Sequence, residues 1–144
     1  MRELIAYAAR RGVTVHVAHL PRPYRGFYDL DRRRVVYDFD LTPIERRVVL
    51  AHELGHDHYG HGCEDDIRAE RAADVFAARL LIDPERYAEL ERLTHDVDAI
   101  AEELAVTPEL IDVYQQHCLT RLRGVTYVRA RMGIGQWHHR SAYA

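Results

Sequence analysis

The residues of this sequence that are best suited to chemistry are His52, Glu53 and His56, which form the motif H-E-x-x-H. Residues four positions apart on a helix lie on the same face, so both imidazoles can bind one metal ion. Glu53 leaves the helix beside that face, where its carboxylate can hold and deprotonate a water molecule on the metal. This combination is typical of zinc hydrolases that cut peptide bonds.

A catalytic zinc ion commonly has three protein ligands and one water molecule, so the motif leaves one ligand to be found. In one large group of these enzymes that ligand is a glutamate on the following helix, and an acid one turn later orients a histidine ligand. Glu70 and Asp74 lie four positions apart in the next predicted helix and share a face. We predict that Glu70 is the third ligand and that Asp74 orients a histidine. The alternative is that both are surface charges on an acidic helix.

The motif needs a helix to carry it, and the residues before it have the features of a helix start. Thr42 is a favourable N-cap, Pro43 fits the first helical position, and Glu45 completes a capping box. We expect the helix to extend to about Tyr59, because Gly60 follows it. The sequence therefore predicts one helix that contains the whole motif.

A second helix is predicted from Cys63 to Ile82, with Ile67, Phe76, Leu80 and Leu81 among its packing residues. Ala73 and Ala77 lie beside the face that carries the two acidic residues. Such small side chains would let this helix approach the helix of the motif closely. We therefore expect the metal site to be formed between these two helices.

The remaining elements predict an α+β fold with a small antiparallel or mixed sheet packed against a helical bundle. Before the motif we expect a helix and three strands, over residues 1–11, 13–17, 26–29 and 34–40. After the second helix we expect three helices and a strand, over residues 84–93, 96–104, 107–119 and 124–131. We expect residues 1–131 to form one metallopeptidase domain and residues 132–144 to form a flexible C-terminal tail.

The composition is that of an ordinary globular protein. The chain has 144 residues, of which 47% are apolar and 30% are charged. Its apolar runs are far shorter than the ~20 residues that a membrane span needs. The N-terminus has charges at both ends and predicts a short helix rather than a signal peptide. We expect a cytoplasmic protein without membrane attachment, in which Cys63 and Cys118 are reduced.

The charge is distributed unevenly along the chain. Residues 51–120 carry 5 arginines and 17 acidic residues, a net charge of -12. Residues 101–111 look like a helix-turn-helix, but the would-be recognition helix carries Glu109 and Asp112 and no arginine. Because phosphates would be repelled there, we expect a helical pair that packs on the core and does not bind nucleic acid directly.

The HELGH motif, followed by ERAADVFAARLLIDP from Glu70 to Pro84, resembles the ImmA/IrrE family of metallopeptidases. The preceding hairpin and the helix start T-P-x-E-x-R are also similar, so the resemblance covers roughly residues 1–120. The chain departs from the family pattern in Asp74, where Asn is frequent, and in Ile82-Asp83-Pro84, where Met-Pro is frequent. Neither departure removes a ligand.

The resemblance implies a zincin-like core of the gluzincin type. In it, His52, His56 and Glu70 would bind the metal, Glu53 would be the catalytic base and Asp74 would support a ligand. Zinc is the expected cofactor, and Mn²⁺ and Fe²⁺ remain alternatives because His/His/Glu sites accept several metals.

The resemblance also implies a substrate class. Family members are small zinc-dependent proteases, often from phages and mobile elements, that cleave helix-turn-helix repressors. A protein substrate of this kind, a transcriptional repressor, is therefore expected. One alternative is a metal-binding regulatory module that associates with a repressor without cleaving it, and a weaker one is a DNA-binding protein.

For two features of catalysis the sequence gives candidates only. Substrates of zincins often lie against a sheet edge, and the strand over residues 34–40 is the candidate for that edge. A donor is also needed for the negative charge that develops on the substrate oxygen. The candidates are Tyr24, His58, Tyr59 and His61.

Overall fold

The computed structural model describes residues 1–62, 66–122 and 125–128. Its elements in chain order are α1 (Arg2–Arg10), β1 (Thr14–Ala18), β2 (Gly26–Asp29), β3 (Arg34–Asp38), α2 (Pro43–Tyr59), α3 (Ile67–Leu81), α4 (Pro84–Leu93), α5 (Val97–Leu104), α6 (Pro108–His117), β4 (Leu119–Leu122) and β5 (Val125–Val128). The predicted tail over residues 132–144 and the predicted domain end at residue 131 lie outside the described residues.

The three-stranded sheet is mixed and has the strand order β1-β3-β2. Strand β3 pairs parallel with β1 and antiparallel with β2, so the predicted hairpin is present. The expectation that the later hairpin strand forms the sheet edge is wrong, because β3 is central and β2 is the edge. Strand β3 is central because β1 pairs with it and not with β2. Its residues Val35, Val36 and Tyr37 are all buried, and such a continuous buried apolar run is typical of an inner strand.

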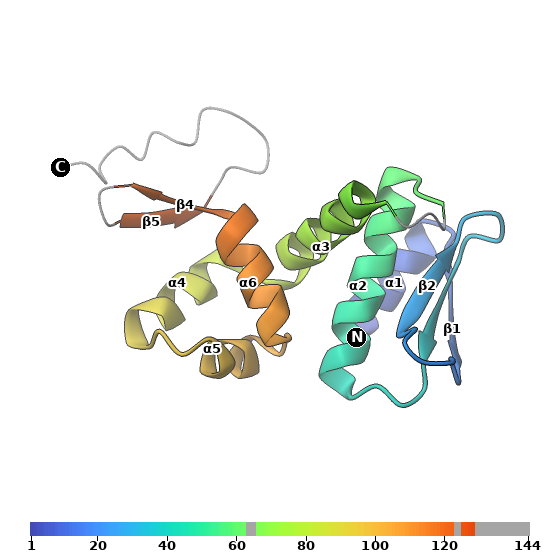
Figure 1. The fold of residues 1–144 in the computed structure, drawn as a ribbon, viewed down its shortest axis with the longest axis horizontal. Helices are drawn as coiled ribbons and strands as arrows, with labels where there is room; N and C mark the ends of the chain where they lie inside the picture. The colour runs from blue at the N-terminus through green and yellow to red at the C-terminus, as the bar shows by residue number, and fades with distance from the viewer. Residues whose placement is uncertain (63–65, 123–124, 129–144) are drawn as a thin grey trace.

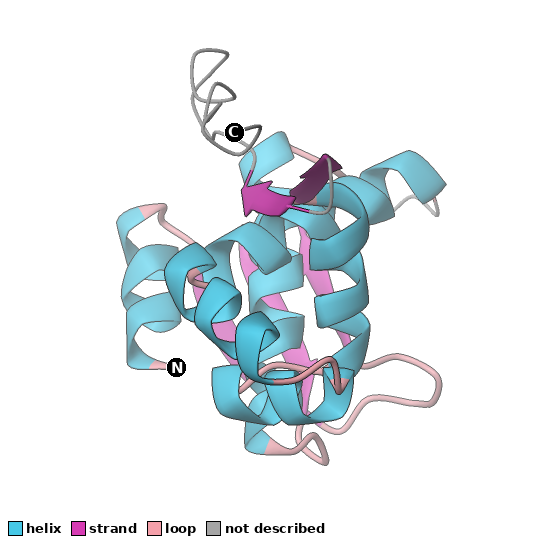
Figure 2. Ribbon diagram, turned by 90° about the vertical axis from the view of Figure 1, so that its left-hand side faces the viewer, coloured by secondary structure: helices cyan, strands magenta, loops and turns pink. Residues whose placement is uncertain are grey.

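The helices cover one side of this sheet. Figure 1 shows α2 beside the sheet, α3 beside α2, and the group α4 to α6 beyond them. In Figure 2 the strands of the sheet lie behind the helices. One apolar core connects these parts: Val35 of β3, Leu50 and Leu54 of α2 and Ile111 of α6 are all completely buried. The predicted α+β fold, with a small sheet on a helical bundle, is confirmed.

Helix α2 begins and ends as predicted. The Thr42 hydroxyl accepts a hydrogen bond from the Glu45 amide at 3.3 Å, and the Glu45 carboxylate accepts one from the Thr42 amide at 2.8 Å. The helix ends at Gly60, which has the left-handed φ of 69° that glycine adopts without strain. His52 and His56 therefore lie inside a helix with both ends capped.

Helix α3 begins at Ile67, because the Asp66 side chain caps it by accepting a hydrogen bond from the Arg68 amide at 2.9 Å. Cys63, the predicted first residue, lies outside the described residues. The prediction that Ile67 and Leu80 pack in the core is wrong, since they are 77% and 38% exposed. The prediction holds for Leu81, which is buried, and for Phe76, which packs partly buried against the core. The rest of the buried face of α3 is a row of small side chains, comprising Ala69, Ala73, Ala77 and Ala78.

Gly55 lies where α2 packs against α3. A Cβ atom at Gly55 would lie 2.9 Å from Ala73 Cα and 3.1 Å from the Ala73 carbonyl oxygen. Both are backbone atoms, which cannot rotate away. The two helices therefore approach as closely as they do because this position has no side chain.

The C-terminal part of the described chain differs from the prediction in one respect. The helix expected to reach Leu119 ends at His117, and Leu119 begins β4, which pairs antiparallel with β5. Helices α5 and α6 pack on each other, and α6 packs on α3, as the helical-pair interpretation predicts. Among the described residues, none of the helices has the length and apolar character needed to cross a lipid bilayer.

Asp57 connects the end of α2 to α1 and to the hairpin. Its buried carboxylate accepts hydrogen bonds from Arg11 Nε, from the Tyr28 hydroxyl at 2.8 Å and from Arg33 Nη2 at 3.0 Å. Burial by itself raises the pKa of Asp57, but the hydrogen bonds from Arg11, Tyr28 and Arg33 outweigh it and hold the pKa below its ordinary value. The residue next to His56 is thereby tied to strand β2.

We predict that Gly55→Ala lowers the free energy of unfolding by about 1–3 kcal/mol, because the added methyl group meets backbone of α3. Urea denaturation of the purified protein measures this change. Gly62→Ala is the matched control, since no atom of the described residues would lie within 4 Å of a Cβ atom there. Equal stability of Gly55→Ala and the unchanged protein would contradict the close helix contact.

We predict that Asp57→Asn lowers the free energy of unfolding by about 2 kcal/mol at pH 7, because the charged acceptor is lost. The folded-state pKa of Asp57 lies below its ordinary value of 3.8, so this stabilisation is fully present above that value. It is lost as the pH falls through the folded-state pKa. Urea denaturation from pH 7 to pH 3 should show the difference shrinking only below about pH 4, whereas exposed Asp31→Asn should show little difference at any pH.

Candidate metal centre

Three predicted ligands converge at the contact between α2 and α3. His52 Nε2 lies 3.1 Å from His56 Nε2, and the Glu70 carboxylate oxygens lie 3.1 Å and 3.2 Å from these two nitrogens. One donor atom from each residue lies within 4.8 Å of the others. Ligands at zinc–nitrogen and zinc–oxygen bond lengths in a tetrahedral site are separated by about 3.3 Å, so the donors are spaced as one ion requires. Two imidazoles and a carboxylate also match the chemistry of a zinc site.

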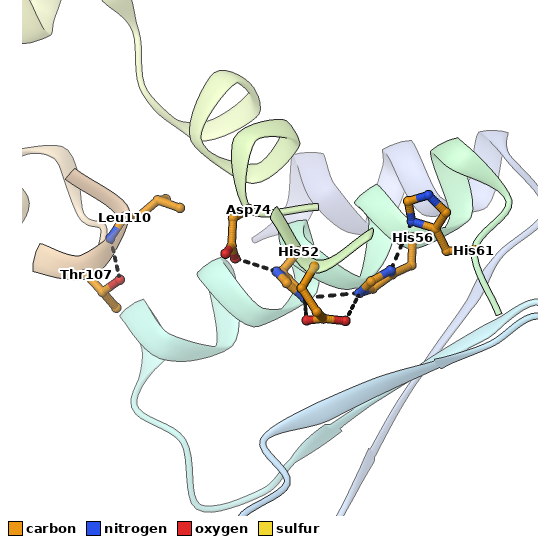
Figure 3. Close-up of polar contacts among 7 residues, drawn as sticks. His52, His56, His61, Asp74, Thr107 and Leu110 are labelled. Carbon is orange, nitrogen blue, oxygen red and sulfur yellow. Dashed lines mark hydrogen bonds and ion pairs between the residues drawn. The ribbon is translucent and has the colours of Figure 1, made fainter. Parts of the chain in front are cut away.

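Asp74 supports the first of these histidines. Its Oδ1 lies 2.8 Å from His52 Nδ1, the ring nitrogen that does not face Glu70 (Figure 3). With Nε2 directed at the ligand cluster, Nδ1 carries the hydrogen and donates it to the carboxylate. Burial by itself lowers the pKa of His52, but the hydrogen bond to Asp74 and the nearby carboxylates raise it overall. Asp74 thus lies within hydrogen-bond distance of a predicted ligand, on the side of its ring away from the cluster.

His61 lies beside Nδ1 of His56, as Asp74 lies beside Nδ1 of His52. Its Nδ1 lies 3.4 Å from His56 Nδ1, and its amide donates a hydrogen bond to the His56 carbonyl at 2.9 Å. The His61 ring stacks on Tyr59 at a centroid distance of 5.4 Å. From the sequence, His61 is a candidate donor to the substrate oxygen, and a second metal site with His58 is a less favoured alternative to a surface position. The signal that identifies its actual place is Gly60, whose left-handed conformation turns the chain back toward the helix.

The other candidates for a hydrogen-bond donor to the substrate oxygen differ in whether they line the cleft. Tyr24 is 63% exposed and lines the cleft beside Glu53. The rings of His58 and Tyr59 contact Phe76 instead, and neither is among the described residues that line the cleft. Of the four candidates, Tyr24 is therefore the one that a substrate in the cleft can reach.

Glu53 is buried beside the ligands and faces strand β2. A Cβ atom on Gly26 would lie 3.4 Å from Glu53 Oε1, which shows how closely the carboxylate approaches the strand. Burial raises the pKa of Glu53 to about 7; the neighbouring His52 opposes this shift and the Glu70 charge adds to it. A cation among the ligands would lower this pKa again. Without a cation among the ligands, Glu53 can therefore exchange a proton with a weak acid close to neutral pH.

A cleft leads from the protein surface to these residues. It has a volume of about 570 Å³, and its lining includes the three ligands, Glu53 and residues 26–28 of β2. Because β2 pairs only with β3 among the described residues, its other edge is open to an added strand. The strand edge at the site is thus β2, and not the strand that the sequence analysis proposed.

The IrrE N-terminal-like domain model, Peptidase_M78, matches residues 8–113. The chain belongs to this family. The match confirms the resemblance to ImmA/IrrE metallopeptidases and places the IrrE-like domain among metallopeptidase-like or IrrE-type regulatory proteins. Among curated proteins, no sequence matches the chain.

A solved structure is also similar to the IrrE-like domain. It is a Mycobacterium tuberculosis transcriptional regulator, with a TM-score of 0.59 and 20% sequence identity over 85% of this chain. The match spans 41% of the length of that regulator. At this identity the similarity supports the α+β fold and no more.

We predict that Asp74→Ala weakens zinc binding about 10- to 100-fold, because it removes the acceptor that orients His52. Competition with a chromophoric chelator measures the affinity. Asp74→Asn should lose much less, since it keeps an oxygen acceptor at the same place. Asp112→Ala, which removes an exposed acid of α6, is the control. The orienting role is wrong if Asp74→Ala binds zinc as tightly as this control.

Proposed function

We propose that this protein is a zinc-dependent endopeptidase that cleaves a protein substrate, a helix-turn-helix repressor of a phage or mobile element. Family membership supports the peptidase class. The observation that carries the proposal is the convergence of His52, His56 and Glu70 beside the buried carboxylate of Glu53. Residues 1–131 would form the catalytic domain, acting in the cytoplasm, where such a repressor is found.

In this proposal, His52, His56 and Glu70 would hold a zinc ion, and the bound ion would supply Lewis-acid chemistry for the scissile carbonyl group and the attacking water. Glu53 accepts the proton of the attacking water and then donates it to the nitrogen of the leaving amine. Asp74 fixes the ring of His52 through its 2.8 Å hydrogen bond. Mn²⁺ or Fe²⁺ would also bind to these three ligand residues.

The substrate backbone is proposed to lie along the open edge of β2. An extended peptide can pair with the main chain of that strand, as in other cases of strand addition. The pairing would place the peptide beside Glu53, because Gly26 of β2 packs against this carboxylate. The hydroxyl of Tyr24 would donate to the oxygen of the scissile carbonyl, since Tyr24 lines the same cleft.

A second candidate function is regulation by association, in which the domain binds a repressor and does not cleave it. The observation that favours this alternative is the family match itself, because the IrrE-like domain is shared by metallopeptidase-like and IrrE-type regulatory proteins. Direct DNA binding is not part of either proposal, because α6 presents Glu109 and Asp112 where a recognition helix would need cations.

We predict that Glu53→Gln keeps zinc but slows cleavage about 10²- to 10⁴-fold, because it removes the proton acceptor and leaves the ligands intact. The substrate to use is a helix-turn-helix repressor encoded next to this gene, with cleavage followed on denaturing gels and zinc measured by mass spectrometry. His52→Ala is the companion variant and should lose both zinc and cleavage.

A reporter gene under that repressor distinguishes the two candidate functions. If Glu53→Gln still releases the reporter while the repressor stays uncut, association is the function. If release disappears together with cleavage, the peptidase proposal stands.

A further inference from the structure

The cleft continues past Glu53 into a second hollow of about 420 Å³. Both parts of the cleft are lined by Tyr24, Gly26, His52 and Glu53, so these residues stand at the boundary between them. A peptide that lies along β2 therefore passes from one part to the other at the position of the catalytic groups. A side chain next to the scissile bond would enter the second hollow.

The second hollow has an aliphatic wall with carboxylates at its rim. Val48 and Val49 of α2 form part of the wall, together with the buried Leu110 of α6. Asp74 and Glu109 supply the carboxylates. Figure 3 shows Thr107 and Leu110 on the side of Asp74 that lies away from His56, which places the start of α6 at this end of the cleft.

Most charges that line this hollow already have partners. Arg25 forms an ion pair with Glu45, and Asp74 binds His52. Glu109 is exposed, and within the described parts of the chain no ion pair is formed by its carboxylate. The N-terminus of α6 opposes this negative charge with a partial positive charge of only about half a unit. The uncompensated charge at the rim is therefore negative.

We propose that this hollow is a specificity subsite for a long basic side chain of the substrate. The aliphatic stem of an arginine or lysine would lie on Val49 and Leu110, and its cationic end would pair with Glu109. The inference rests on the proposed peptidase function and adds a substrate class to it, namely proteins with a basic residue next to the scissile bond. An apolar side chain would fill the wall but leave Glu109 without a partner, and an acidic one would be repelled.

Peptidyl hydroxamates test the subsite without requiring turnover, because the hydroxamate binds zinc while a neighbouring side chain enters the subsite. Two series are needed, with the variable residue on either side of the chelating group. The variable residue is arginine, norleucine or glutamate, and acetohydroxamate is the parent compound. With the zinc-loaded full chain we expect the arginine compound of one series to bind about 5- to 10-fold more tightly than its norleucine counterpart, and the glutamate compound to bind most weakly.

Two variants identify Glu109 as the determinant. Glu109→Gln should abolish the preference for arginine over norleucine, and Glu109→Arg should invert it so that the glutamate compound binds more tightly than the arginine compound. Glu102→Arg, an equal change of charge at an exposed position of α5, should keep the original order. Since each preference is a ratio measured on one folded protein, a loss of stability cannot produce the inversion.

The outcomes separate the subsite from the function on which it rests. If acetohydroxamate does not bind the zinc-loaded protein, the proposed peptidase centre is wrong, and the subsite with it. If acetohydroxamate binds but the three side chains bind equally, or if Glu109→Arg keeps the preference for arginine, the subsite is wrong and the peptidase centre stands.

Discussion

The close packing of α2 on α3 is the constraint on which the rest of the structure depends. The candidate ligands come from two helices. The side chain of Glu70 on α3 is short, so its carboxylate reaches both imidazoles of α2 only when the two helix backbones are close together. Gly55 and Ala73 permit this distance because neither presents a side chain larger than a methyl group. The small residues between the helices are therefore as necessary to the candidate metal centre as its candidate ligands.

Helix α2 also shows how one buried carboxylate can differ from another four residues away. Asp57 accepts hydrogen bonds from three donors, two of them guanidinium groups, so its pKa lies below the ordinary value. Glu53 is buried and receives no such hydrogen bond from the residues that the structure describes, and burial raises its pKa to about 7. The first arrangement holds a permanent negative charge that anchors the helix, and the second leaves a group that can exchange a proton.

The parts of this structure that the sequence predicted depend on local geometry. The capping box of Thr42 and Glu45 and the four-residue spacings within the ligand helices need nothing beyond a helix. The sheet order was missed because which hairpin strand becomes central depends on pairing with the distant β1. The exposure of Ile67 was missed because helical spacing does not say which apolar face meets a neighbour. The place of His61 was missed because it follows from a chain reversal at Gly60.

The mixed pairing of β3 implies an order of assembly for the sheet. Strands β2 and β3 are joined by a short turn, and hairpins of this kind form within about 1–10 μs. In the sequence, β2 lies between β1 and its partner β3. The parallel pairing of β1 with β3 therefore closes a longer loop than the hairpin does, and the entropic cost of closing it is larger. The hairpin can therefore form before the sheet is complete. On that route, the strand edge beside the candidate metal ligands is among the first parts of the protein to form.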